Sequence, residues 1–287
     1  MKKIILISSL LGLLNVANAA NVNIVAAENF YGQLATEIGG KNVTVTSIIN
    51  NPDADPHLFT TSPSTSKAVS NAQIIIYNGA DYDDWMKPIL KTIDTKKVIV
   101  INVADLMNVK LGSNPHLWYQ PQTFPKLANV LADKIKQLSP EDQKEINKNL
   151  QVFLSDNVKV QTLISNNKKV YAGTSVTATE PVFGYMSEAL GLKMYGEDFQ
   201  WKIMNDTEPT PKMIASFQEL FTKKTVKVLF YNSQVSDTLT ENMKTLAKKN
   251  QVQVVGVTET MPMNTKINQW LTNEVNATVK ALSASKK

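Results

Sequence analysis

The only two histidines of the chain stand in nearly identical five-residue strings, and they are the residues best suited to bind a metal. His57 lies in Asp-Pro-His-Leu-Phe at 55–59, and His116 lies in Asn-Pro-His-Leu-Trp at 114–118. Proline before each histidine fixes one backbone torsion and favours extended geometry in the residue ahead of it. We therefore expect each imidazole on a stiff loop. Two neutral imidazoles held in this way suit the first two ligand positions of a divalent transition metal.

Carboxylates are the remaining hard ligands, because the chain has no cysteine and so no thiolate ligand, disulfide or thiol nucleophile. Glu180 and Glu259 each follow a strand-like run. Taken alone, each glutamate is simply a solvated charge that complements a helix dipole. When the two histidine loops are also considered, we favour a ligand role for Glu180. For Glu259, the choice between a metal ligand and a solvated charge stays open. Glu28 and Asp237 are the alternatives for the fourth position.

Strand-like and helix-like segments alternate along the chain. Strands are predicted at residues 23–27, 43–49, 73–77, 97–103, 169–173, 226–231 and 252–257, and helices at 30–38, 63–71, 82–93, 181–190, 211–221 and 267–282, with Ser236 as the cap of a further helix. Continuous apolar strands that alternate with helices predict parallel sheets covered on both faces. The predicted fold is α/β with two lobes, each a mostly parallel sheet flanked by helices.

One long central helix is predicted to join the two lobes. Residues 139–142 (Ser-Pro-Glu-Asp) form a helix start, and apolar residues then recur at helical spacing without proline or glycine up to Gly173. The run predicts about 27 helical residues and a length of about 40 Å. We expect a signal peptide at 1–19, an N-terminal lobe at 20–138, the linking helix at 139–167 and a C-terminal lobe at 168–287. Ligands of open α/β sheets bind at the carboxyl ends of the strands, which favours one shared cleft.

The first 19 residues have the features of a cleavable export signal. Lys2 and Lys3 precede a short apolar run, and Ala-Asn-Ala at 17–19 forms the cleavage site. The run is too short and interrupted for a permanent transmembrane helix. We expect a soluble protein outside the cytoplasm. Without a cysteine at the cleavage point there is no lipid anchor, so the expected location is the periplasm.

The chain carries a formal charge of +5, and all of its 30 basic residues are lysines. Guanidinium groups are the usual tool for bidentate contacts with phosphates, bases and carboxylates. The absence of arginine therefore argues against sequence-specific nucleic-acid binding and against capture of carboxylate solutes. The scattered lysines are explained by a solvated surface.

The chain resembles the metal-binding receptors of bacterial ABC importers for manganese, zinc or iron, over nearly all of its mature length. The motifs that carry the resemblance are Asp-Pro-His at 55–57, Asn-Gly at 78–79, the string at 114–118, the long central helix, and Glu180 before Phe-Gly-Tyr at 183–185. The resemblance implies one ion held between two lobes by His57, His116, Glu180 and Glu259, and delivered to a cognate permease in the inner membrane. In that family the fourth ligand is commonly an aspartate in Thr-Asp-Ser, where this chain has Thr-Glu-Thr at 258–260.

Two imidazoles and two carboxylates offer up to six donor atoms, which suits Mn²⁺ or Fe²⁺, whereas Zn²⁺ binds most such sites more tightly. We expect Zn²⁺ or Mn²⁺, with Fe²⁺ as a third option, bound by a monomeric receptor that is not an enzyme. The imidazoles must be neutral to bind the metal, so the metal affinity is expected to fall below about pH 6.

Two alternative functions stay open. One is an exported metallohydrolase with three metal ligands and a carboxylate general base. The other is a receptor for an organic solute.

Overall fold

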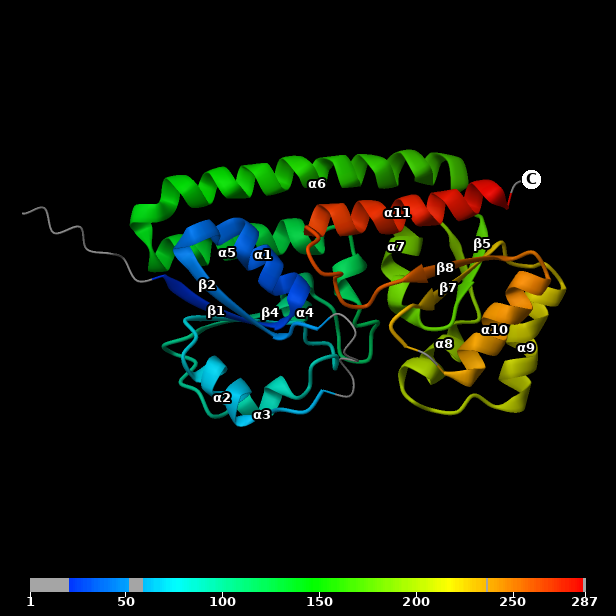
Figure 1. Cartoon of the computed structure of the whole chain (residues 1–287), viewed down its shortest axis with the longest axis horizontal. Helices are drawn as coiled ribbons and strands as arrows, with labels where there is room; N and C mark the ends of the chain where they lie inside the picture. The colour runs from blue at the N-terminus through cyan, green and yellow to red at the C-terminus, as the bar shows by residue number, and fades with distance from the viewer. Residues whose placement is uncertain (1–20, 52–58, 236, 286–287) are drawn as a thin grey trace, which may run out of the picture.

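The chain folds around two four-stranded parallel sheets, one in each half of the sequence (Figure 1). The computed structural model describes residues 21–51, 59–235 and 237–285. The predicted signal peptide, His57 and the predicted cap Ser236 lie outside these residues. Two parallel sheets with helices around them confirm the predicted α/β class.

The first sheet has the strand order β2-β1-β3-β4, and every neighbouring pair is parallel. Its strands are β1 (Val22–Glu28), β2 (Val43–Ile49), β3 (Ile74–Tyr77) and β4 (Ile99–Asn102). The helices of this half are α1 (Asn29–Gly39), α2 (Pro63–Ser70), α3 (Met86–Leu90), α4 (Val103–Met107) and α5 (Thr123–Leu138), with short 3-10 helices at Gly40–Asn42, Leu117–Tyr119 and Pro140–Asp142. β1 and β3 lie at the centre of the sheet and are almost wholly apolar, as strands covered on both faces must be.

The second sheet repeats the arrangement with the order β6-β5-β7-β8, again fully parallel. Its strands are β5 (Ser175–Ala178), β6 (Lys193–Tyr195), β7 (Val228–Asn232) and β8 (Gln253–Val257). The helices of this half are α7 (Gly184–Ala189), α8 (Glu197–Met204), α9 (Pro211–Thr222), α10 (Thr238–Lys249) and α11 (Ile267–Ala284), with a 3-10 helix at Pro181–Phe183. In each half, three helical crossovers connect the four parallel strands, which end at the same edge of the sheet, so loop residues from several strands gather there.

Helix starts follow the sequence signals closely. The Ser62 side chain accepts the N–H of Thr65 at 3.2 Å and, with Pro63 next to it, begins α2 as predicted. Helix α10 begins at Thr238 and has Asp237 as its N-cap, one residue after the predicted cap Ser236. The Asp237 carboxylate accepts the N–H of Thr240 at 2.8 Å, and aspartate is an equally good cap.

Two predicted elements are wrong in extent or type. The helix predicted at 82–93 is limited to α3, because the preceding residues form a turn in which Ala80 and Asp81 have positive φ and Asp83 accepts two backbone N–H groups. The strand predicted at 169–173 is helical as far as Tyr171, and β5 begins only at Ser175. The buried Tyr171 extends the apolar face of the long helix by a further turn.

The long helix α6 (Gln143–Tyr171) has 29 residues and runs along both halves of the molecule (Figure 1). It packs against α1 and α5 of the first half and against α11, the last helix of the chain. The predicted long central helix is therefore confirmed. The lobe boundaries at residues 138 and 168 stay a prediction.

One large apolar core cluster extends through both halves, and each half has a smaller cluster of its own. On α11, Trp270 stacks on Phe30 of α1 with ring centroids 5.9 Å apart, and it also packs on Tyr119 at 5.5 Å. Tyr119 in turn packs on Phe183 of the second half at 4.9 Å. These aromatic contacts bury the junction of the halves, so relative movement there exposes apolar surface to water.

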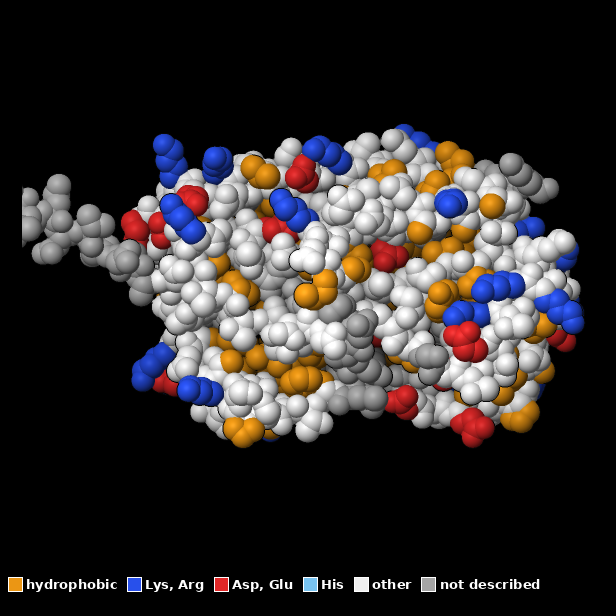
Figure 2. Space-filling model, in the orientation of Figure 1, with side chains coloured by type: hydrophobic (Ala, Val, Ile, Leu, Met, Phe, Trp, Pro, Cys, Tyr) orange, Lys and Arg blue, Asp and Glu red, His pale blue; other side chains and the backbone are white. Residues whose placement is uncertain are grey.

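Lysine side chains are spread over the visible face and do not gather into one basic patch (Figure 2). Among residues 21–51, 59–235 and 237–285, no helix has both the length and the apolar character needed to cross a bilayer.

Candidate metal centre

Several candidate ligands lie at or just after the ends of strands. Glu28 ends β1, Glu180 follows β5 and Glu259 follows β8. His116 lies directly before the 3-10 helix at Leu117–Tyr119, in the loop between α4 and α5. A hydrogen bond from Tyr82 in the first half to Glu259 in the second shows that the two strand edges meet.

His116 and Glu259 come together in the buried junction between the halves. The Nε2 atom of His116 lies 3.9 Å from Oε1 of Glu259, and the two side chains are 0% and 1% exposed. This separation exceeds that of a hydrogen bond. Two metal–ligand bonds of about 2.0–2.2 Å each can span it. The two side chains are therefore close enough for one cation to contact both.

The Glu259 carboxylate is held by donors on both of its oxygens. The Tyr82 hydroxyl donates to Oε1 at 2.9 Å, and the amide of Asn232 donates to Oε2 at 2.6 Å. The Gln234 side chain also accepts the backbone N–H groups of Glu259 at 2.6 Å and Thr260 at 2.9 Å. A carboxylate fixed by donors on both oxygens is a preorganised cation ligand.

Burial, and secondly the Glu259 charge, raise the pKa of Tyr82 well above its ordinary value, so the phenol stays protonated and able to donate. Tyr82, Asn232 and Gln234 were not among the residues singled out from the sequence. The position of Asn232 was the available signal, since it is a polar residue at the buried carboxyl end of an apolar strand.

The His116 loop is fixed on both sides of the proline. The amide of Asn78, at the end of β3, donates to the carbonyl of Pro115 at 2.9 Å. Oδ1 of Asn114 lies 2.6 Å from Nδ1 of His116. The buried Trp118 packs edge-on to the imidazole with centroids 5.2 Å apart. The stiff loop predicted from the proline is thus held by hydrogen bonds and by ring packing.

Glu180 is 6% exposed and lies at the edge of a cavity of about 410 Å³ whose lining includes Asp206, Glu208 and Asp237. Its neighbour Pro181 accepts a hydrogen bond from Asn114, so the Glu180 loop is tied to the His116 loop. Across the described part of the chain, no three or more His, Asp or Glu side chains gather closely enough to form a metal site. The structure thus brings together His116 and Glu259. His57, predicted with His116 for the first two ligand positions, falls outside the described residues.

The two reserve candidates have different surroundings. Glu28 is fully buried; burial, and then the charge of Asp83, raise its pKa well above the usual value. Burial also raises the pKa of Asp83 to about 6, although the N–H groups of Gly79 and Asn78 oppose the shift. A protonated Glu28 must lose its proton before it can bind a metal. Asp237 caps α10 with its carboxylate.

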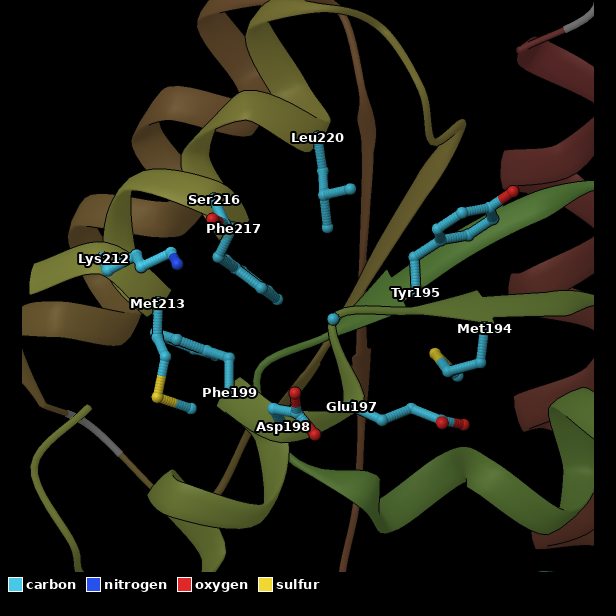
Figure 3. Close-up of a pocket in the computed structure, with 11 residues that line it drawn as sticks. Met194, Tyr195, Glu197, Asp198, Phe199, Lys212, Met213, Ser216, Phe217 and Leu220 are labelled. Carbon is cyan, nitrogen blue, oxygen red and sulfur yellow. The ribbon is translucent and has the colours of Figure 1, made fainter. Parts of the chain in front are cut away.

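A separate hollow of about 540 Å³ lies entirely within the second half (Figure 3). Its lining comes from β6 and the helices α8 and α9, and Phe199 and Phe217 stack at its base with centroids 4.0 Å apart. Met194 and Met213 line opposite sides, with carboxylates of Glu197 and Asp198 nearby (Figure 3). Of the candidate ligands that the structure describes, none lines this hollow, which is therefore separate from the His116–Glu259 pair.

The chain is similar to named metal-binding proteins over most of its length. A putative metal-binding protein of Thermotoga maritima is 29% identical over 203 residues, which are 68% of this chain and 70% of that protein. The manganese-binding lipoprotein MntA of Halalkalibacterium halodurans is 22% identical over 242 residues, or 82% of this chain and 78% of its own.

Solved structures show the same architecture. The periplasmic zinc-binding protein TroA from Treponema pallidum superposes with a TM-score of 0.77 at 15% identity, covering 92% of this chain and 99% of that one. At this identity the likeness concerns the fold. A family model described as zinc-uptake complex component A, periplasmic, matches residues 24–281, nearly all of the chain. The two-sheet architecture and the matched sequence agree, and the chain belongs to this family, named ZnuA.

Proposed function

We propose that this protein is an extracytoplasmic receptor that captures one divalent transition metal between its two halves and delivers it to an ABC importer. The observation that carries the proposal is the buried pair of His116 and Glu259, which come from opposite halves and have their ligand atoms 3.9 Å apart. Because the two side chains come from different halves, metal binding would depend on the fold of the whole chain. The relatives named for manganese and zinc binding support this assignment.

The proposed ligand set is His57, His116, Glu180 and Glu259. Imidazole nitrogens and carboxylate oxygens together fit Zn²⁺ or Mn²⁺, with Fe²⁺ as a third option. Fixation of Glu259 through both oxygens favours a site formed before the ion arrives, which reduces the cost of ordering ligands on binding. Glu180 enters the proposal because its loop is bonded to the His116 loop.

A receptor explains this ligand set better than an enzyme does. Four protein ligands leave little room for the activated water that catalytic metal sites keep. The relatives reported above are named for metal binding, and none of the three is named as a hydrolase. We therefore favour a non-catalytic, monomeric carrier over the metallohydrolase and over a receptor for organic solutes.

The proposed location is the periplasm, where the carrier would meet a cognate permease in the inner membrane. The signal-like first 19 residues support export. MntA is named as a lipoprotein, whereas this chain has no cysteine to carry a lipid. We therefore propose a receptor that diffuses freely in the periplasm.

Calorimetric titration with Zn²⁺ and with Mn²⁺ tests the proposal. We expect tight 1:1 binding to the wild type, and a loss in His116→Ala larger than the roughly 10- to 100-fold that removal of an outer-shell partner costs. Glu259→Gln should also bind weakly, because its amide NH₂ takes the place of a ligand oxygen and faces a donor, Tyr82 or Asn232. Glu241→Gln, an exposed change on α10, is the matched control.

Unchanged affinity in both His116→Ala and Glu259→Gln would remove the proposed site. Circular dichroism of each variant separates loss of a ligand from loss of the fold. Mass spectrometry of the purified protein provides a second check, since an organic molecule bound in place of a metal contradicts the proposal in favour of the solute receptor.

A further inference from the structure

Asn114 lies at the point where the His116 loop meets the second half. Its Oδ1 is 2.6 Å from Nδ1 of His116 and also accepts the backbone N–H of His116 at 3.0 Å. Its Nδ2 donates to the carbonyl of Pro181 at 2.8 Å. Every polar atom of this amide therefore has a partner on one of the two loops that carry candidate ligands.

The orientation of the Asn114 amide follows from its partners. A carbonyl such as that of Pro181 can only accept, so the amide nitrogen must face it. A backbone N–H such as that of His116 can only donate, so the amide oxygen must face that group. The two requirements are independent and agree, which fixes Oδ1 toward the imidazole.

The oriented amide sets the tautomer of the histidine. Because Oδ1 is an acceptor, Nδ1 of a neutral His116 carries the proton and donates it. Nε2 then keeps its lone pair on the side of Glu259, 3.9 Å from Oε1. This is the tautomer that can bind a metal through Nε2 without first moving a proton.

The same side chain connects the two halves. Pro181 directly follows Glu180, so the bond from Asn114 holds the peptide next to that candidate ligand. A second bond runs in the opposite direction, from the Tyr185 hydroxyl on α7 to the backbone carbonyl of Asn114 at 2.8 Å. The His116 and Glu180 loops are thereby joined through one residue.

Gly184 provides the space for this arrangement. A Cβ atom at Gly184 would lie 2.8 Å from Nδ2 of Asn114, closer than real Cβ contacts allow. Its backbone φ is −56°, an ordinary helical value, so the requirement for glycine here is steric. A side chain at Gly184 therefore requires the Asn114 amide nitrogen or the backbone near it to shift.

We propose that Asn114 is a positioning residue for metal capture, which fixes the His116 tautomer and fastens that ring to the loop carrying Glu180. The inference rests on the proposed function, since it explains how two ligands from opposite halves are held ready for one ion. Asn114 itself binds no metal in this proposal.

Nuclear magnetic resonance of ¹⁵N-histidine-labelled, metal-free protein tests the inference, because the chain has only two histidines to assign. At a pH where the rings are neutral, wild-type His116 should show the Nδ1–H tautomer. Asn114→Ala should shift it toward the Nε2–H form. The same variant should bind Zn²⁺ about 10- to 100-fold more weakly in calorimetry.

Two further variants separate positioning from a general effect on folding. Gly184→Ala should change the His116 tautomer and the Zn²⁺ affinity in the same direction as Asn114→Ala does. Tyr185→Phe should weaken Zn²⁺ binding but keep the wild-type tautomer, because it leaves the Asn114 amide untouched. Asn129→Ala is the matched control, since this exposed asparagine on α5 donates only to the carbonyl of Pro125.

An Asn114→Ala protein with the wild-type tautomer and wild-type affinity overturns the inference while the proposed function stands. A wild-type protein that takes up neither Zn²⁺ nor Mn²⁺ overturns the proposed function, and this inference with it. A tautomer shift together with weaker binding supports the assignment of Asn114.

Discussion

Buried carboxyl groups near the candidate metal centre differ in their surroundings. Glu259 has a hydrogen-bond donor on each oxygen. Glu28 and Asp83 are buried close to each other, and burial raises the pKa of each. A carboxyl group whose pKa is raised must lose its proton before it can bind a metal, so proximity to the candidate metal centre alone does not make it a ligand.

The Tyr82 hydroxyl is expected to contribute to metal affinity through Glu259. Tyr82→Phe keeps the ring packed on Trp118, at 5.0 Å between centroids, but removes one of the two donors to the carboxylate. We expect Zn²⁺ binding weaker by about tenfold, the lower end of outer-shell effects. Calorimetric titration measures the Zn²⁺ affinity, and Tyr195→Phe on β6 is the control. Equal affinities for Tyr82→Phe and wild type would show that Asn232 alone suffices to hold Glu259.

Glu274 should make the stability of the fold depend on pH. It is buried on α11 and accepts the hydroxyl of Thr258 at 3.2 Å, behind the Glu259 loop. Burial raises the pKa of Glu274 from 4.5 to about 7. Between these values the folded state binds more protons than the unfolded state, so the free energy of unfolding falls as the pH rises. The contribution is complete below about pH 4.5 and is lost as the pH passes about 7.

Glu274→Gln removes this titration while keeping an oxygen for Thr258. Relative to wild type, the variant should gain up to about 3 kcal/mol of unfolding free energy between pH 4 and pH 8, from 1.36 kcal/mol per pKa unit. Urea unfolding of metal-free protein at the two pH values measures the difference. Glu241→Gln, an exposed residue, should track the wild type at both. Parallel curves for Glu274→Gln and wild type would show that Glu274 has an ordinary pKa.

Three of the candidate acidic residues lie at helix starts. Glu28 precedes α1, Glu180 precedes the 3-10 helix at Pro181–Phe183, and Asp237 begins α10. An acidic residue before a helix has a structural role available in capping the free N–H groups. Only Asp237 uses its carboxylate in that way in this group, because Oδ1 accepts the N–H of Thr240.

Two substitutions of Asp237 distinguish a cap from a metal ligand. Asn is as good a cap as Asp, so Asp237→Asn should leave stability nearly unchanged, whereas Asp237→Ala should lower it by about 1 kcal/mol. Neither change should alter the Zn²⁺ affinity if Glu259 is the fourth ligand. Chemical denaturation and calorimetry on the same samples give both quantities. Loss of Zn²⁺ affinity in a stable Asp237→Asn protein would reassign the fourth position to Asp237.

At the scale of the whole molecule, the shared core limits how far the halves can move. Helix α6 packs against elements of the first half and against α11, and Trp270 on α11 stacks on Phe30 of α1. Opening the junction exposes these rings, at a cost of about 25 cal/mol for each Å² of apolar surface. We therefore expect an ion to enter through movement of local loops, while the two sheets keep their positions relative to each other.

Metal binding should stabilise the whole chain against heat. An ion that binds only the folded state adds about 2.7 kcal/mol at a free concentration of 100 times Kd. For a chain of this size, 1 kcal/mol corresponds to about 2–4 °C in Tm. Scanning calorimetry with Zn²⁺, and then with excess chelator, should show a rise of several degrees that the chelator reverses. His116→Ala provides the control, since it should melt at one temperature in both conditions. A wild-type Tm that stays unchanged when Zn²⁺ is added would contradict binding of the ion to the folded state.

The sequence by itself determined most of the strands and helices, and the class of molecule that is bound, a divalent metal ion. Apolar runs and their caps predicted most strands and helices, including the long helix α6, because these signals act within a few residues of each other. The repeated Pro-His strings predicted the metal chemistry. The helix prediction failed at residues 79–83, because the Asp83 carboxylate accepts the N–H groups of Asn78 and Gly79 and holds a turn in place of a helix.

Only the tertiary structure decided which side chains meet. Tyr82 and Glu259 are 177 residues apart, and Asn114 and Pro181 are 67 apart, so no periodic pattern links them. Their contacts exist because two parallel sheets turn their carboxyl edges toward a common junction sealed by aromatic rings. Residue types set what an ion can bind to. The packing of the two halves sets the 3.9 Å between His116 and Glu259, and with it whether one ion can bind both.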